Sequence, residues 1–247
     1  MANTQGTLRI GTCGYTYEHW RDVFYPADLP PSQWLEFYAK HFNSLELKAT
    51  FYHTTSDAMA EKWRQSTPPT FLFSSRASKV ITHNKMLRGC GADLSEFRSS
   101  LIRLGAKLGP VMWQLPSGLR ADIPRLSTFL RVVTQTWRTR HAVEFRHATW
   151  LVPEVEELLA KHNVALVNAD MPRARVVEKA TADFVYLRRH GPRGSNRKAY
   201  SDRSLHEDAE CIGEWRKQGK DVFVYFNNNV DGLAVRNALR LRDICGA

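Results

Sequence analysis

Ionisable side chains stand two residues apart near the ends of several short apolar runs of this chain. Glu144 and Arg146 follow Val143 in HAVEFRH, and Glu46 and Lys48 lie in SLELKAT. Other runs end with similar residue types: Arg76, Gln114, Asp170, Arg188, His190 and Asn227. Carboxylates and imidazoles can transfer protons, and arginine or lysine can hold an anionic group in place. These residue types therefore indicate acid–base chemistry on an anionic substrate.

Alternation along a strand predicts which of these side chains share one face. With Val143 and Phe145 facing outward, Glu144 and Arg146 face inward, and Leu45 and Leu47 assign Glu46 and Lys48 to the interior in the same way. The same rule predicts that the inner face also holds Tyr186, Arg188, His190, Arg76, Gln114, Asn227, Asn168 and Asp170. Each also has a structural explanation on its own: a lone Glu can be half of a buried ion pair, and His190 before Gly191 could be a turn histidine. However, so many ionisable inner residues at one end favour a functional site, because charged groups are seldom buried without partners.

The apolar runs that carry these residues recur eight times. They begin at Leu8, Ser44, Thr70, Gly109, His141, Asn163, Asp183 and Asp221. Helical patterns fall between them at 31–42, 56–66, 93–108, 123–133, 150–161, 202–218 and 232–242. This rhythm is typical of parallel βαβ units, and eight repeats in 247 residues predict an α/β fold with one (β/α)8 TIM-type barrel spanning 1–247. The segment 171–182 has a poor helical pattern, so an irregular crossover is expected between strands six and seven.

The net charge of the chain indicates which kinds of partner it can bind. Lys and Arg number 35 against 25 Asp and Glu, a net charge of +10, which suggests anionic ligands such as phosphate, a phosphorylated compound or nucleic acid. The sequence contains no apolar run long enough to span a membrane and no signal-like N-terminus, so a soluble, cytoplasmic protein without membrane partners is expected. Its four widely spaced cysteines do not suggest a disulfide framework or structural zinc.

Aromatic residues crowd the segment after the first strand, GTCGYTYEHWRDVFYP. Tyr15 and Trp20 could line a ligand wall, with Tyr52 beside them, because aromatic faces bind sugars and bases. Alternatively, Trp20 and Phe24 plug the mouth of the barrel.

Standard cofactor and nucleophile motifs, including GxGxxG, the P-loop, HExxH and GxSxG, are missing from the sequence. Glu46, Glu144, Asp170 and His190 could bind a divalent metal if they converged. Their basic neighbours would repel a cation, so we expect neither a metal nor a cofactor.

Several segments, in their order along the chain, resemble the motifs of the YecE-like family, the domain of unknown function 72. They are GTCGYTYEHW, FYP, LELKATFYHT, ITH, QLP, VEFRHATW, RRHG and FNNN. The resemblance runs from Leu8 to about Leu239 and implies a TIM-type barrel without an established activity. It also implies site roles for residues in these motifs, among them Tyr15, Trp20, Glu46, Tyr52, His83, Gln114, Glu144, Arg146, Trp150, Asp170, Arg188, His190, Asn227 and Asn228. Lys48, Arg76 and Arg189 depart from the usual family pattern of Asn, Lys and an aliphatic residue.

Two hypotheses follow. In the first, the chain is an isomerase, lyase or hydrolase in which Glu144 or Asp170 is the base, His190 is the acid and His83 is a second proton carrier. Arg146, Arg188 and Lys48 would hold the anion, and Gln114, Asn227 and Asn228 would orient hydroxyl groups. In the second, the chain is a nucleotide- or nucleic-acid-binding module without turnover, with aromatic residues over a cationic groove.

Overall fold

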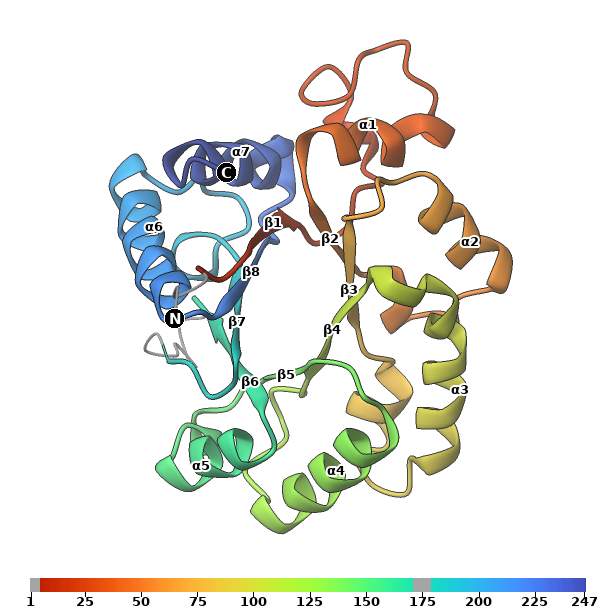
Figure 1. Cartoon of the computed structure of the whole chain (residues 1–247), viewed down its shortest axis with the longest axis vertical. Coiled ribbons are helices and arrows are strands. Elements are labelled where there is room, and N and C mark those ends of the chain that lie inside the picture. Colours follow the sequence, from red (N-terminus) through yellow and green to blue (C-terminus); the bar gives the residue numbers. More distant parts are fainter. Residues whose placement is uncertain (1–4, 171–178) are drawn as a thin grey trace.

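Eight parallel strands form a nearly closed barrel in the computed structural model, which describes residues 5–170 and 179–247 (Figure 1). The strands are β1 Leu8–Thr12, β2 Ser44–Leu47, β3 Leu72–Arg76, β4 Leu108–Gln114, β5 His141–Glu144, β6 Val164–Ala169, β7 Phe184–Arg189 and β8 Asp221–Phe226. Hydrogen-bonded neighbours follow the order β1-β8-β7-β6-β5-β4-β3-β2. Seven strands fall within the predicted runs and β4 begins one residue before its run, so the predicted TIM-type barrel is confirmed.

Helices surround the barrel (Figure 1). They are α1 Trp34–His41, α2 Asp57–Gln65, α3 Gly91–Leu101, α4 Ile123–Thr136, α5 Pro153–Lys161, α6 Asp202–Lys217 and α7 Leu233–Ile244. Ser56 and Asp122 cap α2 and α4 by accepting hydrogen bonds from the backbone of Met59 and Arg125. None of the helices in the part of the chain that the structure describes is long and apolar enough to cross a membrane.

Three predicted helices differ from the observed ones. The pattern over 31–42 predicted a helix that opens at Pro31, but Pro31–Gln33 forms a 3-10 turn and α1 begins at Trp34. The pattern over 93–108 predicted one helix, but α3 ends at Leu101 and a 3-10 segment continues to Lys107, where Gly105 turns the chain with a φ of 54°. The pattern from Trp150 predicted a helix that begins three residues too early. Trp150 closes a separate 3-10 turn, and α5 begins at Pro153, a residue favoured in a first turn. The predicted irregular crossover falls largely on 171–178, outside the described residues.

The seam between β1 and β2 closes the barrel mainly through side chains. Asn43 Oδ1 accepts from the Ile10 amide at 2.9 Å, and the Tyr38 hydroxyl accepts from the Thr12 amide at 2.8 Å. Backbone pairing begins only past the end of β1, where the Gly14 amide donates to the carbonyl of Glu46 at 2.9 Å. Gly11 permits this approach, since a Cβ there would lie 2.0 Å from the Ser44 carbonyl oxygen.

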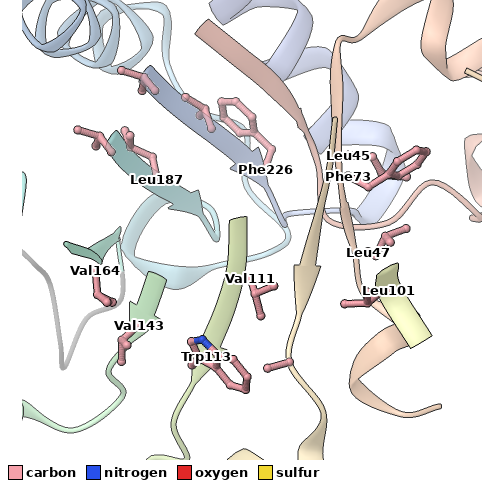
Figure 2. Close-up of a cluster of buried hydrophobic side chains, with 14 of the residues drawn as sticks. Leu45, Leu47, Phe73, Leu101, Val111, Trp113, Val143, Val164, Leu187 and Phe226 are labelled. Atoms are coloured by element: carbon pink, nitrogen blue, oxygen red, sulfur yellow. The ribbon is translucent and has the colours of Figure 1, made fainter. Parts of the chain in front are cut away.

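Alternating side chains divide the core into two parts. Outward residues pack between the strands and the helices, as Figure 2 shows for Val111, Trp113 and Val143. Inward residues fill the barrel itself, and they include Met112, Ala142, Tyr186, Phe223 and Tyr225. This alternation fixes which polar residues at the strand ends reach the mouth of the barrel.

Candidate functional site

Arg188 lies at the centre of a buried ionic cluster inside the barrel, near the end of β7. Its Nε and Nη2 donate to the two carboxylate oxygens of Glu46 at 3.0 and 2.8 Å, and its Nη1 donates to Glu144 Oε2 at 2.5 Å. The hydroxyl of Tyr186 donates to the same Glu46 carboxylate at 2.7 Å. Arg188 therefore joins β2 and β5 across the interior, in the forked geometry that guanidinium favours.

A second arginine and a histidine complete the cluster. Arg146 forms an ion pair with Glu144 and donates from Nη2 to His190 Nε2 at 3.2 Å. The other ring nitrogen of His190, Nδ1, lies 3.0 Å from the side-chain amide of Asn227. The structure thus brings Glu46, Arg146, Arg188 and His190 together, and Glu144 and Arg146 lie at the predicted end of β5.

The charges in the cluster fix its protonation. Burial alone would raise the pKa of Glu144, but Arg188 and Arg146 outweigh it and hold that pKa well below the usual range. Burial lowers the pKa of His190 despite the neighbouring Glu144, so its imidazole is neutral near pH 7. Burial, aided by Glu46, raises the pKa of Cys13 and keeps it a thiol, 3.6 Å from Arg188 Nη2. Glu144 is therefore a fixed anion, and His190 is neutral, with its Nε2 lone pair accepting the hydrogen bond from Arg146.

Arg76 is a cation in excess of these ion pairs. Its guanidinium lies 3.6 Å from the centre of the Phe51 ring, and its Nε is buried without a hydrogen-bond partner among the described residues. Burial and then the charge of Arg188 lower its pKa, whereas Glu46 and Glu144 raise it. The guanidinium of Arg76 is partly desolvated and is repelled by the guanidinium of Arg188. An anion that binds beside Arg76 would therefore stabilise its charge.

His83 contacts the aromatic ring of Phe51, which Arg76 also contacts. Its imidazole packs edge-on against Phe51 at 5.0 Å, and its Nδ1 is 2.9 Å from the Thr82 hydroxyl. Burial, followed by the charges of Arg76, Lys79 and Arg146, lowers its pKa, so His83 is also neutral at pH 7. The turn that carries it, Val80–Asn84, is a π-helix, a form that is often found at functional sites.

Three other predicted residues lie around the cluster. Gln114 ends β4 in register with Glu144, and Lys48 follows β2 in a half-buried position. Tyr52 comes next on the β2 loop with 57% of its surface exposed. Lys48 adds a further positive charge at this end of the barrel, and Tyr52 adds an aromatic face that is open to solvent.

The prediction of a ligand wall is wrong for Trp20, and Trp150, which the family resemblance placed in the site, cannot line it either, because both side chains are almost fully buried. The Trp20 indole donates a hydrogen bond to the carbonyl of Asn229 at 2.9 Å, and the Trp150 indole donates one to the carbonyl of Leu119 at 2.8 Å. Tyr15 packs against this core through Tyr38, 6.4 Å away. The aromatic residues of the first loop stabilise the barrel end, which agrees with the alternative of a plug.

The predicted inner face of β6 is also wrong. The inner residues are Ala165, Val167 and Ala169, because the large rings of β7 and β8 leave room only for small side chains there. Asn168 faces the other way, and its amide exchanges two 2.9 Å hydrogen bonds with the backbone of Lys179. Asp170 accepts a hydrogen bond from the His190 amide at 2.7 Å.

Asp170 and Asn228 hold the loop that follows β7. Besides the His190 amide, Asp170 accepts a hydrogen bond from the Tyr200 hydroxyl. Asn228 is fully buried and donates to the Lys198 carbonyl at 3.0 Å. The Asp170 carboxylate and the amide nitrogen of Asn228 thus position the backbone of this loop. Of the four residues considered for a metal, Asp170 is turned to this loop, and Arg188 lies between Glu46 and Glu144.

Two contributors to the site were not predicted as site residues. Cys13 touches Arg188, and the alternation of Leu8 and Ile10 could have assigned it to the interior. Tyr186 was recognised as an inner residue, but its hydrogen bond to Glu46 depends on the distance across the barrel, which alternation within one strand does not give.

Comparison with known proteins places this barrel in a family. The family described as "Protein of unknown function DUF72" matches residues 9–247, nearly the whole chain. The chain belongs to the DUF72 family. This agrees with the resemblance that its sequence motifs indicated.

Two relatives of this DUF72 protein, YunF and YecE, carry names that state no activity. It is 26% identical to the UPF0759 protein YunF of Bacillus subtilis, over 96% of this chain and 94% of YunF. It is 31% identical to the UPF0759 protein YecE of Escherichia coli, over 50% of this chain and 45% of YecE. A DUF72 family crystal structure from Thermotoga maritima superimposes with a TM-score of 0.88 at 27% identity, covering 98% of this chain and all of that one. One from Enterococcus faecalis has a TM-score of 0.83 at 18% identity, covering 98% and 96% of the two chains, and supports the fold alone.

Proposed function

We propose that this DUF72 protein is a metal-independent enzyme that binds a small anionic substrate at the C-terminal mouth of its barrel. The observation that carries the proposal is the excess of cations over carboxylates. Glu46 and Glu144 are matched by Arg188 and Arg146, and Arg76 remains with a buried Nε that has no partner among the described residues. A phosphate or carboxylate group beside Arg76 would supply the missing acceptor.

In this proposal, His190 is the proton acceptor in place of Glu144. The carboxylate of Glu144 is held by two arginines and its pKa is depressed, so it is a poor base. His190 is neutral, and Arg146 and Asn227 fix the orientation of its ring. Its Nε2 accepts a hydrogen bond from Arg146, so in this proposal Nε2 takes up a proton when the bound anion draws Arg146 away. Deprotonating a carbon or hydroxyl group next to the bound anion suits an isomerase, lyase or hydrolase.

His83 is the second proton carrier of the proposed mechanism. It is less buried than His190, it is neutral, and it shares the ring of Phe51 with Arg76. A substrate anion at Arg76 would therefore lie next to His83. The two histidines approach the mouth from β7 and from the loop after β3, so they could act on different atoms of one substrate.

Replacing Arg76 with methionine is expected to weaken phosphate binding roughly 10- to 100-fold, the effect of removing one charge-assisted hydrogen-bonding group. In the unchanged protein, phosphate should raise the melting temperature by mass action, and in Arg76→Met this increase should largely disappear. Titration calorimetry with inorganic phosphate gives the affinities directly.

Arg9→Met is the matched control, because Arg9 also has a buried Nε without a partner among the described residues, but lies on the first strand near its opposite end. Equal losses in both variants would mean that net charge alone attracts phosphate and would refute the proposed site. The catalytic part is tested with His190→Gln, which should keep the phosphate-induced stabilisation. It should abolish turnover of any phosphorylated or carboxylated compound that the unchanged protein converts.

A further inference from the structure

The loops at the mouth of the barrel carry an uneven distribution of charge. Because all eight strands are parallel, the loops that follow them lie at one end of the barrel. Cations outnumber carboxylates in the loops after β2, β3 and β7, which carry Lys48, Lys79, Arg193, Arg197 and Lys198. After β4, Arg120 is balanced by Asp122, and after β5, Arg146 is paired with Glu144. Exposed acidic residues instead occupy the loops after β1 and β8: Glu18, Asp22, Asp28 and Asp231. The positive charge therefore extends across the mouth on one side, well beyond Arg76.

The loop after β7 is held in a defined shape. The Gly191 amide donates to the Tyr200 hydroxyl at 2.7 Å, and the buried Asn228 binds the Lys198 carbonyl at 3.0 Å. Arg193 adopts left-handed backbone angles, φ 56° and ψ 31°, which cost energy in a residue other than glycine and are often found at functional sites. The loop thus presents the exposed side chains of Arg193, Arg197 and Lys198 from a fixed backbone.

An exposed aromatic ring lies on the β2 loop. Tyr52 is 57% exposed and packs edge-on against Phe51 at 4.9 Å, and Phe51 in turn contacts the guanidinium of Arg76. An open aromatic face next to phosphate-binding cations is the arrangement with which proteins bind an unstacked nucleotide base.

We infer that the anion of the proposed site is a phosphate of a single-stranded nucleic acid that crosses the mouth. This inference rests on the proposed function and names its substrate class. The strand runs from the loop after β7 to the loops after β2 and β3, with one phosphate at Arg76 and a base on Tyr52. A small metabolite at Arg76 would leave the cations of the β7 loop without a role.

Charge and shape exclude two other polyanions. A flat anionic membrane surface would meet the acidic loops after β1 and β8 at the same end of the barrel and be repelled by them. A polyanion without bases, such as polyphosphate, would gain nothing from the exposed Tyr52. A nucleic acid strand satisfies both observations, because it follows one path across the mouth and carries an aromatic base at each phosphate.

The test is binding of a fluorescein-labelled oligo(dT) or oligo(U) 12-mer, measured by fluorescence polarisation over a range of salt concentrations. With the whole protein, the logarithm of the binding constant should fall with the logarithm of the salt concentration with a slope of roughly −0.7 per phosphate contacted, about −2 or steeper. Arg193→Glu/Arg197→Glu should weaken binding more than about 10-fold and reduce this slope, because two phosphate contacts are removed. Tyr52→Ala should weaken binding about 10-fold, as expected for loss of one stacked base.

The matched control is Arg138→Glu/Lys161→Glu. It makes the same change in net charge at exposed residues of the opposite end of the barrel, where α4 leads into β5 and where α5 ends. Binding by the control within twofold of the unchanged protein supports the inference. Equal losses in the control and in Arg193→Glu/Arg197→Glu overturn it, as does polyphosphate binding that matches oligonucleotide binding and ignores Tyr52→Ala.

The inference and the proposed function can fail separately. If inorganic phosphate stabilises the protein through Arg76 and the oligonucleotides do not bind, the nucleic acid strand is refuted and the small-anion site remains. If oligonucleotides bind through Arg193 and Arg197 while Arg76→Met changes neither phosphate nor oligonucleotide binding, the proposed site at Arg76 is refuted, and with it the path of the strand over that site.

Discussion

Replacing Arg188 with methionine is expected to destabilise this DUF72 barrel by about 3–5 kcal/mol, the usual cost of breaking a buried ion pair from one side. Arg188 binds Glu46 at 2.8 Å and Glu144 at 2.5 Å, and all three side chains are at most 3% exposed. Methionine would leave the buried Glu46 carboxylate without a cation, although the Tyr186 hydroxyl would still donate a hydrogen bond to it. Urea unfolding followed by tryptophan fluorescence measures the loss.

The control for this prediction removes the carboxylates as well. In Arg188→Met/Glu46→Gln/Glu144→Gln the buried charges that Arg188 neutralised are absent, so much of the lost stability should return. A single Arg188→Met variant within 1 kcal/mol of the unchanged protein would contradict the view that this arginine holds the interior together (the threshold is about the size of an ordinary substitution effect).

Glu144→Gln is expected to cost about 3 kcal/mol at pH 7, because it leaves Arg188 and Arg146 with one buried carboxylate fewer. The pH dependence should change with it. A depressed folded-state pKa means that Glu144 contributes stability above the pKa of an unfolded glutamate, about 4.3, and that this contribution is lost as the pH falls through the folded-state value. The variant should therefore lose less stability than the unchanged protein when the pH is lowered below about 5.

Two comparisons check the interpretation of Glu144. In a double-mutant cycle with Arg146→Met, a coupling energy above about 1 kcal/mol is expected, since the two side chains form an ion pair. Glu156→Gln removes a carboxylate from a partly exposed pair with Lys179 and should cost less than about 1 kcal/mol. Unchanged or increased stability in Glu144→Gln would instead favour a catalytic carboxylate that the fold holds at a cost.

The sequence predicted the barrel and most of the ionic cluster because alternation is a strong signal when one face is polar. In β5, the order of Val143 and Glu144 fixes the inner face, and β2 behaves in the same way. In β6 the residues Ala165 to Val167 are all apolar, so the sequence does not show which of them face the barrel interior. Asn168 was therefore assigned to the wrong face.

The packing of the loop side chains and the choice of ion-pair partners could not be predicted from the sequence. Nothing in the spacing of Trp20 shows that its indole reaches the carbonyl of Asn229, a residue more than two hundred positions away. Alternation assigned Arg76 to the interior, but its unpaired Nε depends on which carboxylates Arg188 and Arg146 already hold. Charge pairing among four strands is a property of the three-dimensional arrangement, and it decided which residues remain available to a ligand.

The side-chain seam between β1 and β2 has a consequence for how the chain folds during synthesis. The full backbone ladder of β1 is made with β8, the last strand of the chain, so its hydrogen bonds wait for nearly the entire sequence. Until then β1 has a strand edge that Asn43 and Tyr38 cover on one side only, and unpaired edges invite association with other chains. A ribosome-bound chain that ends before Asp221 should consequently bind chaperones and resist protease poorly, and both properties should change abruptly once β8 has emerged.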